Sequence, residues 1–304
     1  MRKLSQALVL AGVITLPALL SASSAIAADA AAPVVAQDAV TRHKEDVHVI
    51  PPSEHTLTAN MALVSDYRFR GVSQTYKLPA VQGGIDYSHA SGFYLGTWAS
   101  SVSGNQYING AGLEMDIYGG YKFEVAKDLT LDLGALFYLY PGAHYNNATK
   151  TKYDNTELYI AAAYKWFSAK YSVTTSDFFG VNKDTYGGTC QDARTGNSAD
   201  CFAADPGNSK GSGYLDLAAN FEVADKLTLG LHVGHQSVKN YSKLGYSDYK
   251  VSLTKDVNGY LLGAAVIGTN AAKGWYTVSE AGAGTTGYKK VSEPTLVLSV
   301  SRSF

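Results

Sequence analysis

The 304-residue sequence has little cysteine, little proline and almost no net charge. Its two cysteines are too few for a small fold held together by several disulfides. A net charge of −1 at pH 7 gives no electrostatic reason to bind nucleic acid, so no such partner is predicted. Beyond residue 27 no run of about 18 apolar residues occurs, which excludes a transmembrane helix there. Glycine and tyrosine are abundant instead, and glycine suits curved sheets better than long helices.

The first 27 residues have the three parts of a secretory signal peptide. Two basic residues follow the initial methionine, residues 7–20 form a mostly apolar core, and Ala27 ends a small-x-small cleavage site. This core is shorter than the about 20 residues that a spanning helix needs. We therefore expect export, cleavage after Ala27, a flexible periplasmic leader at residues 28–55 and a folded part at residues 56–304.

The two cysteines, Cys190 and Cys201, lie in a polar stretch without apolar periodicity. In an exported chain such a pair predicts a disulfide that closes a loop, worth roughly 3 kcal/mol of loop entropy. A metal site is the weaker alternative, because no histidine or further cysteine flanks the pair. Potential metal ligands also gather in the leader, where a solvated tail is favoured: His43, Glu45, Asp46 and His48. No metal and no cofactor is predicted.

Most of the remaining chain alternates apolar and polar residues with a period of two, as a strand with two different faces does. In residues 112–123, for example, Leu113 and Ile117 share one face while Glu114 and Asp116 share the other. The pattern predicts twelve strands, near residues 56–70, 80–89, 93–101, 112–123, 129–140, 156–166, 169–178, 214–223, 227–236, 247–255, 260–268 and 294–304.

The connections between these strands are alternately short and long. The short ones are residues 89–92, 124–128, 167–168, 224–226 and 256–259, and the longer polar ones are near 71–79, 102–111, 141–154, 179–212, 237–246 and 269–293. A soluble β-sandwich is the alternative, but its strands are usually about 5–6 residues long. Strands of about 10 residues match a bilayer crossed at a tilt. We predict an all-β fold: a closed antiparallel transmembrane β-barrel of about 12 strands, with short periplasmic turns and long extracellular loops.

The last predicted strand ends on an aromatic residue, Phe304. Leu296 and Leu298 would face lipid, together with Arg302 near the periplasmic rim, where a charge costs about 0–1 kcal/mol. A terminal aromatic residue on such a strand is the usual mark by which the barrel assembly machinery recognises its clients. Phe304 is therefore predicted to be an assembly signal.

The polar faces of the strands would line the lumen. The predicted pore-lining residues are Asp66, Arg68, Arg70, Asp86, Glu114, Asp116, Lys122, Asp132, Glu157, Lys165, Asp216, Glu222, His232 and Lys250. Acids outnumber bases on this face, which suggests a mild preference for cations.

The end of the predicted first strand carries three of these charges, Asp66, Arg68 and Arg70, while Tyr67 and Phe69 would face lipid. Opposed fixed charges near the extracellular mouth would create a transverse field that screens solutes. A structural salt bridge that holds the first loop is the equal alternative, and the two do not exclude one another.

Residues 63–102 carry a specific motif. The residues concerned are Ser65, Asp66, Tyr67, Arg68, Arg70, Gly71, Ser73, Gln74, Pro79, Gln82, Gly83, Tyr87, His89, Gly92, Gly96 and Trp98. This stretch resembles the opening signature of the TorF family of porins, a proteobacterial outer-membrane family of otherwise unknown function. The resemblance extends over nearly all of residues 56–304. It implies an outer-membrane channel and names no solute.

The predicted function is thus a porin for passive diffusion of small polar solutes, and not an enzyme. One alternative is an outer-membrane lipid hydrolase, in which His235 and Ser237 share a strand face near Asn240. Another is a non-conducting binding barrel that uses its long loops at residues 179–212 and 269–293. The predicted partners are outer-membrane lipids and lipopolysaccharide, the barrel assembly machinery and small polar solutes; a homo-oligomer stays open.

Overall fold

The computed structural model describes residues 54–304 except 108, 110–111, 146–147, 191–200 and 280–287. The predicted signal peptide, its cleavage after Ala27 and nearly all of the predicted leader lie outside the described residues. In the described part no helix is long and apolar enough to cross a membrane.

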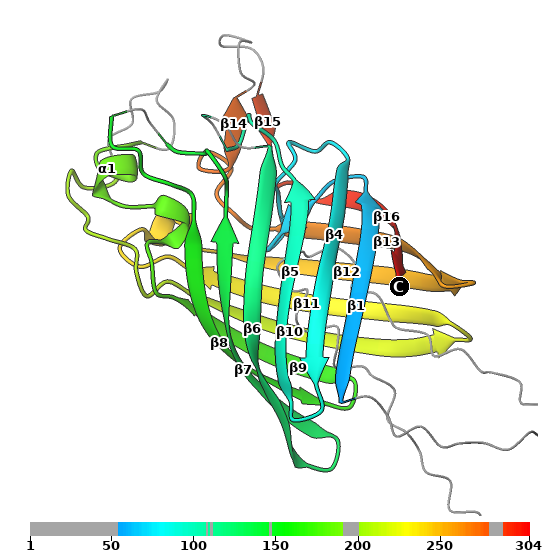
Figure 1. Ribbon diagram of the computed structural model, residues 1–304. Coiled ribbons are helices and arrows are strands. Elements are labelled where there is room, and N and C mark those ends of the chain that lie inside the picture. The colour runs from blue at the N-terminus through cyan, green and yellow to red at the C-terminus, as the bar shows by residue number, and fades with distance from the viewer. Residues whose placement is uncertain (1–53, 108, 110–111, 146–147, 191–200, 280–287) are drawn as a thin grey trace, which may run out of the picture.

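Twelve antiparallel strands form one closed barrel (Figure 1). They are β1 (His55–Val64), β4 (Ala80–His89), β5 (Phe93–Ser101), β6 (Leu113–Ala126), β7 (Leu129–Leu139), β8 (Asn155–Tyr164), β9 (Phe167–Thr174), β10 (Gly213–Ala224), β11 (Leu227–Ser237), β12 (Tyr246–Val257), β13 (Tyr260–Thr269) and β16 (Thr295–Ser303). Each strand pairs with the barrel strands before and after it in sequence, and β16 returns to pair with β1. The predicted fold class and strand number are therefore confirmed.

One end of the barrel, which we call the turn end, carries the tight turns between β4 and β5, β6 and β7, β8 and β9, β10 and β11, and β12 and β13. In the last of these, Asn258 and Gly259 have φ values of 55° and 82°. The type I′ turn of two-residue hairpins needs positive φ at both central positions, so this pair fits its turn. The longer connections lie at the opposite end, the loop end (Figure 1).

The outer face of the barrel is apolar. Large side chains such as Leu158, Ile160 and Leu298 are about half exposed there, alternating with buried inward residues. Leu131 and Leu217, which a β-sandwich would bury between two layers, lie on this outer face and are only partly buried. A closed sheet with an apolar exterior has no unpaired edge in lipid, so the fold is that of a transmembrane barrel.

The seam between β1 and β16 is short. Its register runs from Asn60 opposite Ser303 to Val64 opposite Ser299. Phe304 extends it by one step, because its N–H donates to Ala59 O at 2.8 Å and its carbonyl accepts from Ala59 N at 3.1 Å. The four residues of β1 before Ala59 therefore continue past β16 and pair with β4 alone.

Several loops at the loop end contain short elements and pack together. Loop 1 (residues 65–79) contains the small strands β2 (Arg68–Phe69) and β3 (Val72–Ser73). Loop 4 (residues 175–212) contains the 3₁₀ turn η2 (Phe178–Gly180) and the helix α1 (Lys183–Tyr186). Loop 5 (residues 238–245) contains η4 (Ser242–Leu244), and loop 6 (residues 270–294) contains β14 (Thr277–Ser279) and β15 (Tyr288–Lys290).

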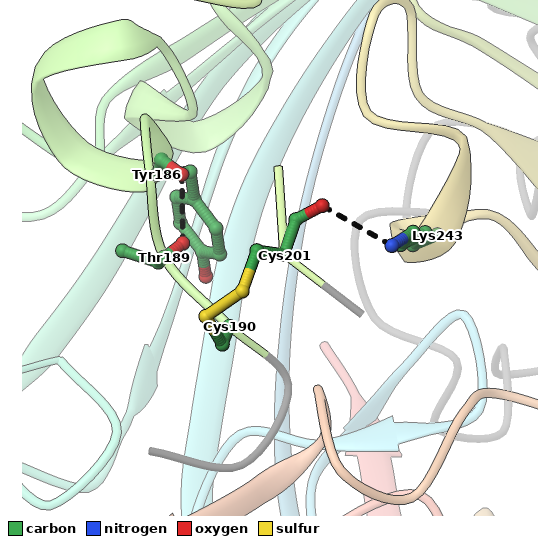
Figure 2. The surroundings of a disulfide bond; sticks show 5 residues. All are labelled: Tyr186, Thr189, Cys190, Cys201 and Lys243. Atoms are coloured by element: carbon green, nitrogen blue, oxygen red, sulfur yellow. Dashed lines mark hydrogen bonds between the residues drawn. A yellow bond between two sulfur atoms is a disulfide. The ribbon is translucent and has the colours of Figure 1, made fainter. Parts of the chain in front are cut away.

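Loops 4, 5 and 6 share an apolar cluster in which Val181, Phe202, Tyr241 and Leu244 pack together, with Trp275 against them. The predicted Cys190–Cys201 disulfide is present in loop 4 (Figure 2). Beside it, Lys243 Nζ of loop 5 donates to the carbonyl of Cys201 at 3.2 Å, so the disulfide of loop 4 is attached to the neighbouring loop (Figure 2).

Candidate functional site

Loop 1 folds into the barrel instead of extending the first strand. The predicted strand over residues 56–70 ends at Val64, and Tyr67 and Phe69, which were expected to face lipid, are 0% and 8% exposed inside the barrel. The chain bends at Ser65 and Asp66, directly after β1, and then forms the hairpin of β2 and β3. Arg70 and Gly71 have φ values of 48° and 80°, and positive φ at both central positions makes this hairpin tight.

The carboxylate of Asp66 organises this hairpin from within. It accepts hydrogen bonds from Ser73 Oγ at 2.5 Å, from Thr75 Oγ1 at 3.2 Å and from Arg68 Nε at 2.7 Å. Arg68 also donates hydrogen bonds to residues outside the hairpin. Its Nη1 donates to the carbonyl of Glu293 at 2.9 Å, and its Nη2 donates to Thr295 Oγ1 at 2.6 Å. The Asp66–Arg68 pair is thus the structural salt bridge that holds the first loop, and it ties loop 1 to loop 6 and β16.

Arg70 crosses the lumen from the hairpin tip to the barrel wall. Its Nη2 donates to both carboxylate oxygens of Glu157 on β8, at 2.9 and 2.7 Å, and its Nη1 donates to Gln236 Oε1 on β11 at 2.6 Å. Its guanidinium carbon also lies 4.1 Å from the ring centroid of Tyr214 on β10. Burial alone would lower the pKa of Arg70, but the carboxylate of Glu157 raises it above the ordinary value. The guanidinium therefore stays charged.

Aromatic contacts fix loop 1 to the remaining walls. Tyr67 donates its hydroxyl to Glu114 Oε1 on β6 at 2.9 Å and packs edge-on against Trp98 on β5. Phe69 packs edge-on against Tyr138 on β7. On the opposite side, a Cβ at Gly71 would lie 2.8 Å from Asp248 Cβ on β12. Loop 1 thus reaches walls on opposite sides of the barrel and fills the lumen at the loop end.

An acidic patch on the wall lies next to loop 1. Glu114 and Asp116 on β6 are both 0% exposed. Both carboxylate oxygens of Asp116 and Oε2 of Glu114 are buried without a hydrogen-bond partner among the residues that the structure describes. Together with Glu157, which is paired with Arg70, this patch places three acidic side chains close to one another on the lumen wall.

Charged groups nearer the turn end form paired networks with tyrosines. Tyr118 donates to Asp86 at 2.6 Å on one wall, and Tyr94 donates to Asp132 at 2.7 Å on the next. Lys122 Nζ lies 3.9 Å from Asp132.

The facing wall holds a third network around a histidine. The Nε2 of His232 lies 2.8 Å from Asp248, and its Nδ1 lies 3.5 Å from Asp216. Lys250 occupies the same inner face, opposite His232 in the register of β11 and β12. Glu222 follows the inner parity of β10 but is exposed at the turn end.

One predicted lumen residue is misplaced. Lys165 lies exposed in the turn between β8 and β9 with φ of 53°, and its Nζ is 5.2 Å from the ring centroid of Tyr164. The apolar–polar alternation of the sequence continues past the end of β8, whereas the positive φ of Lys165 turns the chain there. This residue belongs to the turn rather than to the lumen wall.

Sequence reasoning missed the tyrosines as partners of the lumen acids. Six hydroxyl-bearing rings bond carboxylates or stack on cations inside the barrel: Tyr67, Tyr94, Tyr118, Tyr138, Tyr159 and Tyr214. The available signal was the unusual number of tyrosines on the polar parity of the strands. Because a tyrosine also suits a lipid-facing rim, parity alone did not show their inward role.

The residues proposed for a hydrolase do not come together. His235 and Ser237 both lie on β11, but Nδ1 of His235 is 2.9 Å from Ser247 Oγ on β12. The side chain of Asn240 donates to the carbonyl of Asn208 in loop 4 at 2.8 Å. No hydrogen bond joins His235 to Ser237 within the described residues, so the predicted arrangement of nucleophile and base is not formed.

Distant likenesses to solved outer-membrane proteins accompany this geometry. The KdgM porin aligns with a TM-score of 0.46 at 10% identity, over 81% of this chain and 99% of that one. The NanC porin aligns with a TM-score of 0.44 at 10% identity, over 82% and 99%. OccAB3 of Acinetobacter baumannii aligns with a TM-score of 0.37 at 9% identity, over 84% and 66%. The pairing of this chain's own strands establishes the fold, and these likenesses add no argument to it.

No curated protein matches the chain. One family model does, over residues 49–304, and it therefore covers the whole barrel together with the inward loop 1. That family is described as a bacterial protein of unknown function, Gcw_chp, and the chain belongs to it.

Proposed function

We propose that the protein is an outer-membrane channel through which small polar solutes diffuse passively. The observation that carries this proposal is a closed barrel with an apolar exterior and an interior lined by charged and hydroxyl groups. A barrel of twelve strands lies between eight-stranded ones, whose own side chains fill the interior, and open sixteen-stranded pores. Its inner wall would then be wide enough to need a filling element, and loop 1 supplies one.

The proposed orientation places the turn end in the periplasm and the loop end outside the cell. Short turns on the periplasmic side and longer loops on the outer side are the usual arrangement of outer-membrane barrels. The proposed signal peptide would deliver the chain to this membrane. Phe304, on the last strand, is proposed to be read by the assembly machinery.

Loop 1 would set the width of the channel. Solutes must pass the contacts that Arg70 and Tyr67 make with opposite walls, so the conductance of the resting protein should be small. The Asp66 and Glu157 charges are neutralised by arginines within loop 1. The excess of acids over bases on the lumen wall would then favour cations over anions, by the mechanism of charged rings in other channels.

Recording from the purified mature protein in a planar bilayer tests the proposal. We expect discrete openings of low conductance and a reversal potential in a salt gradient that indicates cation preference. Replacing residues 67–76 by a short glycine–serine linker should increase the conductance several-fold, because the walls remain while the filling element is gone. A linker variant that is folded and inserted yet passes no current would contradict the channel. Anion preference would contradict the role of the acids.

A further inference from the structure

Three potential metal ligands meet at the turn-end rim, outside the lumen. His55 at the start of β1 and His89 at the end of β4 stand directly opposite each other in the register of the two strands, which lie side by side in Figure 1. Their ring centroids are 5.0 Å apart. Glu54 precedes His55, and its Oε2 lies 4.0 Å from His89 Nε2.

The geometry of this cluster is close to that of a ligand set. Each of the three side chains offers one ligand atom, and these atoms all lie within 4.8 Å of one another. Tetrahedral metal–ligand distances near 2 Å would draw the most distant of these atoms together by up to about 1.5 Å. Glu54 is 76% exposed, so its carboxylate can make that movement without displacing either strand.

Hydroxyl groups beside both imidazoles favour coordination through the same ring nitrogen. Nδ1 of His55 lies 2.9 Å from the Tyr87 hydroxyl, and Nδ1 of His89 lies 2.8 Å from Ser91 Oγ. A metal-bound imidazole carries its proton on the other nitrogen and donates it to such a neighbour. His89 Nδ1 also accepts the Ser91 N–H at 3.1 Å, and metal binding would exchange that bond for one donated to Ser91 Oγ.

We propose that Glu54, His55 and His89 bind a divalent transition-metal ion, of which Zn²⁺ is the simplest probe. Two imidazoles and one carboxylate suit zinc, whereas calcium and magnesium require ligand sets made of oxygens. Three protein ligands leave a further position for water. The bound ion joins the start of β1 to the end of β4, in the part of β1 that extends past β16.

The site is independent of transport, because His55 and His89 share the outward parity of Leu57 and Ile85 rather than that of the lumen residue Asp86. Occupation should make the overhanging end of β1 more rigid and raise the temperature at which the barrel unfolds. Neither effect requires the channel to conduct.

Calorimetric titration of the metal-stripped mature protein with Zn²⁺ in detergent tests the proposal. We expect one saturable site in the wild type, and its loss in His55→Ala and in His89→Ala. Tyr87→Phe keeps the ring and removes the hydroxyl, so it should weaken binding at least about tenfold. Circular dichroism verifies that each variant retains the sheet.

Two controls locate the site. His144→Ala removes a partly buried histidine at the loop end and should leave the titration unchanged. The double variant His43→Ala/His48→Ala removes the histidines of the leader and should also leave it unchanged. Binding that survives both His55→Ala and His89→Ala, binding that disappears with the leader histidines, or no binding by the wild type would overturn the proposal.

Discussion

Arg70 illustrates how one side chain can hold a loop inside a barrel. Its side chain is 7% exposed, its Nη2 donates to both carboxylate oxygens of Glu157 on one wall, and its Nη1 donates to Gln236 on another. A planar guanidinium with separate donor nitrogens can bond two walls at once, and the single ammonium of a lysine does not reproduce that arrangement. The residue thus determines where the hairpin tip rests.

Replacing Arg70 by alanine should both destabilise the protein and open it. Glu157 would be left buried and unpaired, which costs about 3–5 kcal/mol of unfolding free energy. The hairpin tip would lose its anchor, so single-channel conductance should rise.

Denaturant unfolding and bilayer recording measure the two effects of Arg70→Ala. Arg302→Ala is the matched control, because Arg302 lies on the outer face against the Tyr260 ring and touches neither loop 1 nor the lumen. Unchanged conductance in Arg70→Ala would show that loop 1 does not limit flow.

Asp116 presents the opposite situation, a buried carboxyl group whose two oxygens have no hydrogen-bond partner among the described residues. Asp116→Asn keeps the shape and removes a group that is costly to ionise in this buried position, so unfolding free energy should rise by about 1 kcal/mol or more. Asp132→Asn serves as the comparison, because Asp132 accepts a hydrogen bond from Tyr94 and lies near Lys122; this variant should lose stability. A stability loss in Asp116→Asn equal to that in Asp132→Asn would contradict the unpaired state of the Asp116 carboxyl group.

At the scale of elements, the hairpin of loop 1 is the part that sequence reasoning placed wrongly. Its residues alternate as a strand does, and Arg68 and Arg70 share the parity of Asp66. The signal against a strand was Gly71, because an arginine–glycine pair can form a two-residue turn. The alternation of apolar and polar residues indicates which side chains share a face, but it does not indicate where the backbone turns back.

Gly71→Ala tests how tightly the hairpin tip fits the opposite wall. Its φ of 80° strains any other residue, and a Cβ would contact Thr269 Cγ2 and Asp248 Cβ. Gly259→Ala is the matched control, because Gly259 has a similar φ of 82° and nothing within 4 Å of an added Cβ. Both variants should lose about 1–3 kcal/mol of stability from backbone strain, and only Gly71→Ala should also raise conductance. Equal conductance in the two variants would mean that the added methyl group at residue 71 does not displace the hairpin tip from the wall.

The disulfide acts on loop 4 rather than on the barrel strands. Cys190→Ser/Cys201→Ser should make loop 4 more susceptible to limited proteolysis. Without the cross-link the unfolded loop regains conformational entropy worth up to roughly 3 kcal/mol, so local unfolding becomes easier. The barrel itself should keep its strand content. Mass spectrometry of the fragments identifies the cut sites, and a reduced wild-type sample is the control. Cleavage no faster than in the oxidised wild type would show that the packing of Phe202 and Trp275 suffices.

At the scale of the whole molecule, the sequence contained nearly all of the architecture. The strands agree because each needs only two faces of different polarity and a turn at each end, and both are local properties. For example, the alternation around Leu113 and Asp116 is visible without knowing what either residue touches. The contacts of Arg70 with Glu157 and Gln236 join residues far apart in sequence, so no local sequence pattern predicts them. The lumen wall was therefore largely predictable, whereas the loop that fills it was not.

Phe304 allows the proposed assembly role to be separated from structure. Its ring is 68% exposed and its backbone pairs with Ala59, so Phe304→Ala should change the unfolding free energy of the purified protein by no more than about 0.5 kcal/mol. Membrane fractions should nevertheless contain several-fold less protein if the ring is read during assembly. If Phe304→Ala reached the outer membrane in wild-type amounts, the proposed role of Phe304 as an assembly signal would be contradicted.

The short seam between β1 and β16 also has a consequence for biogenesis. Because the strand made first must find the strand made last, the cylinder cannot seal while the chain is still emerging, however complete its hairpins are. Until then the backbone N–H and C=O groups along both edge strands of the open sheet stay unpaired and can pair with another chain. The incomplete sheet therefore needs a chaperone until its last strand is in place.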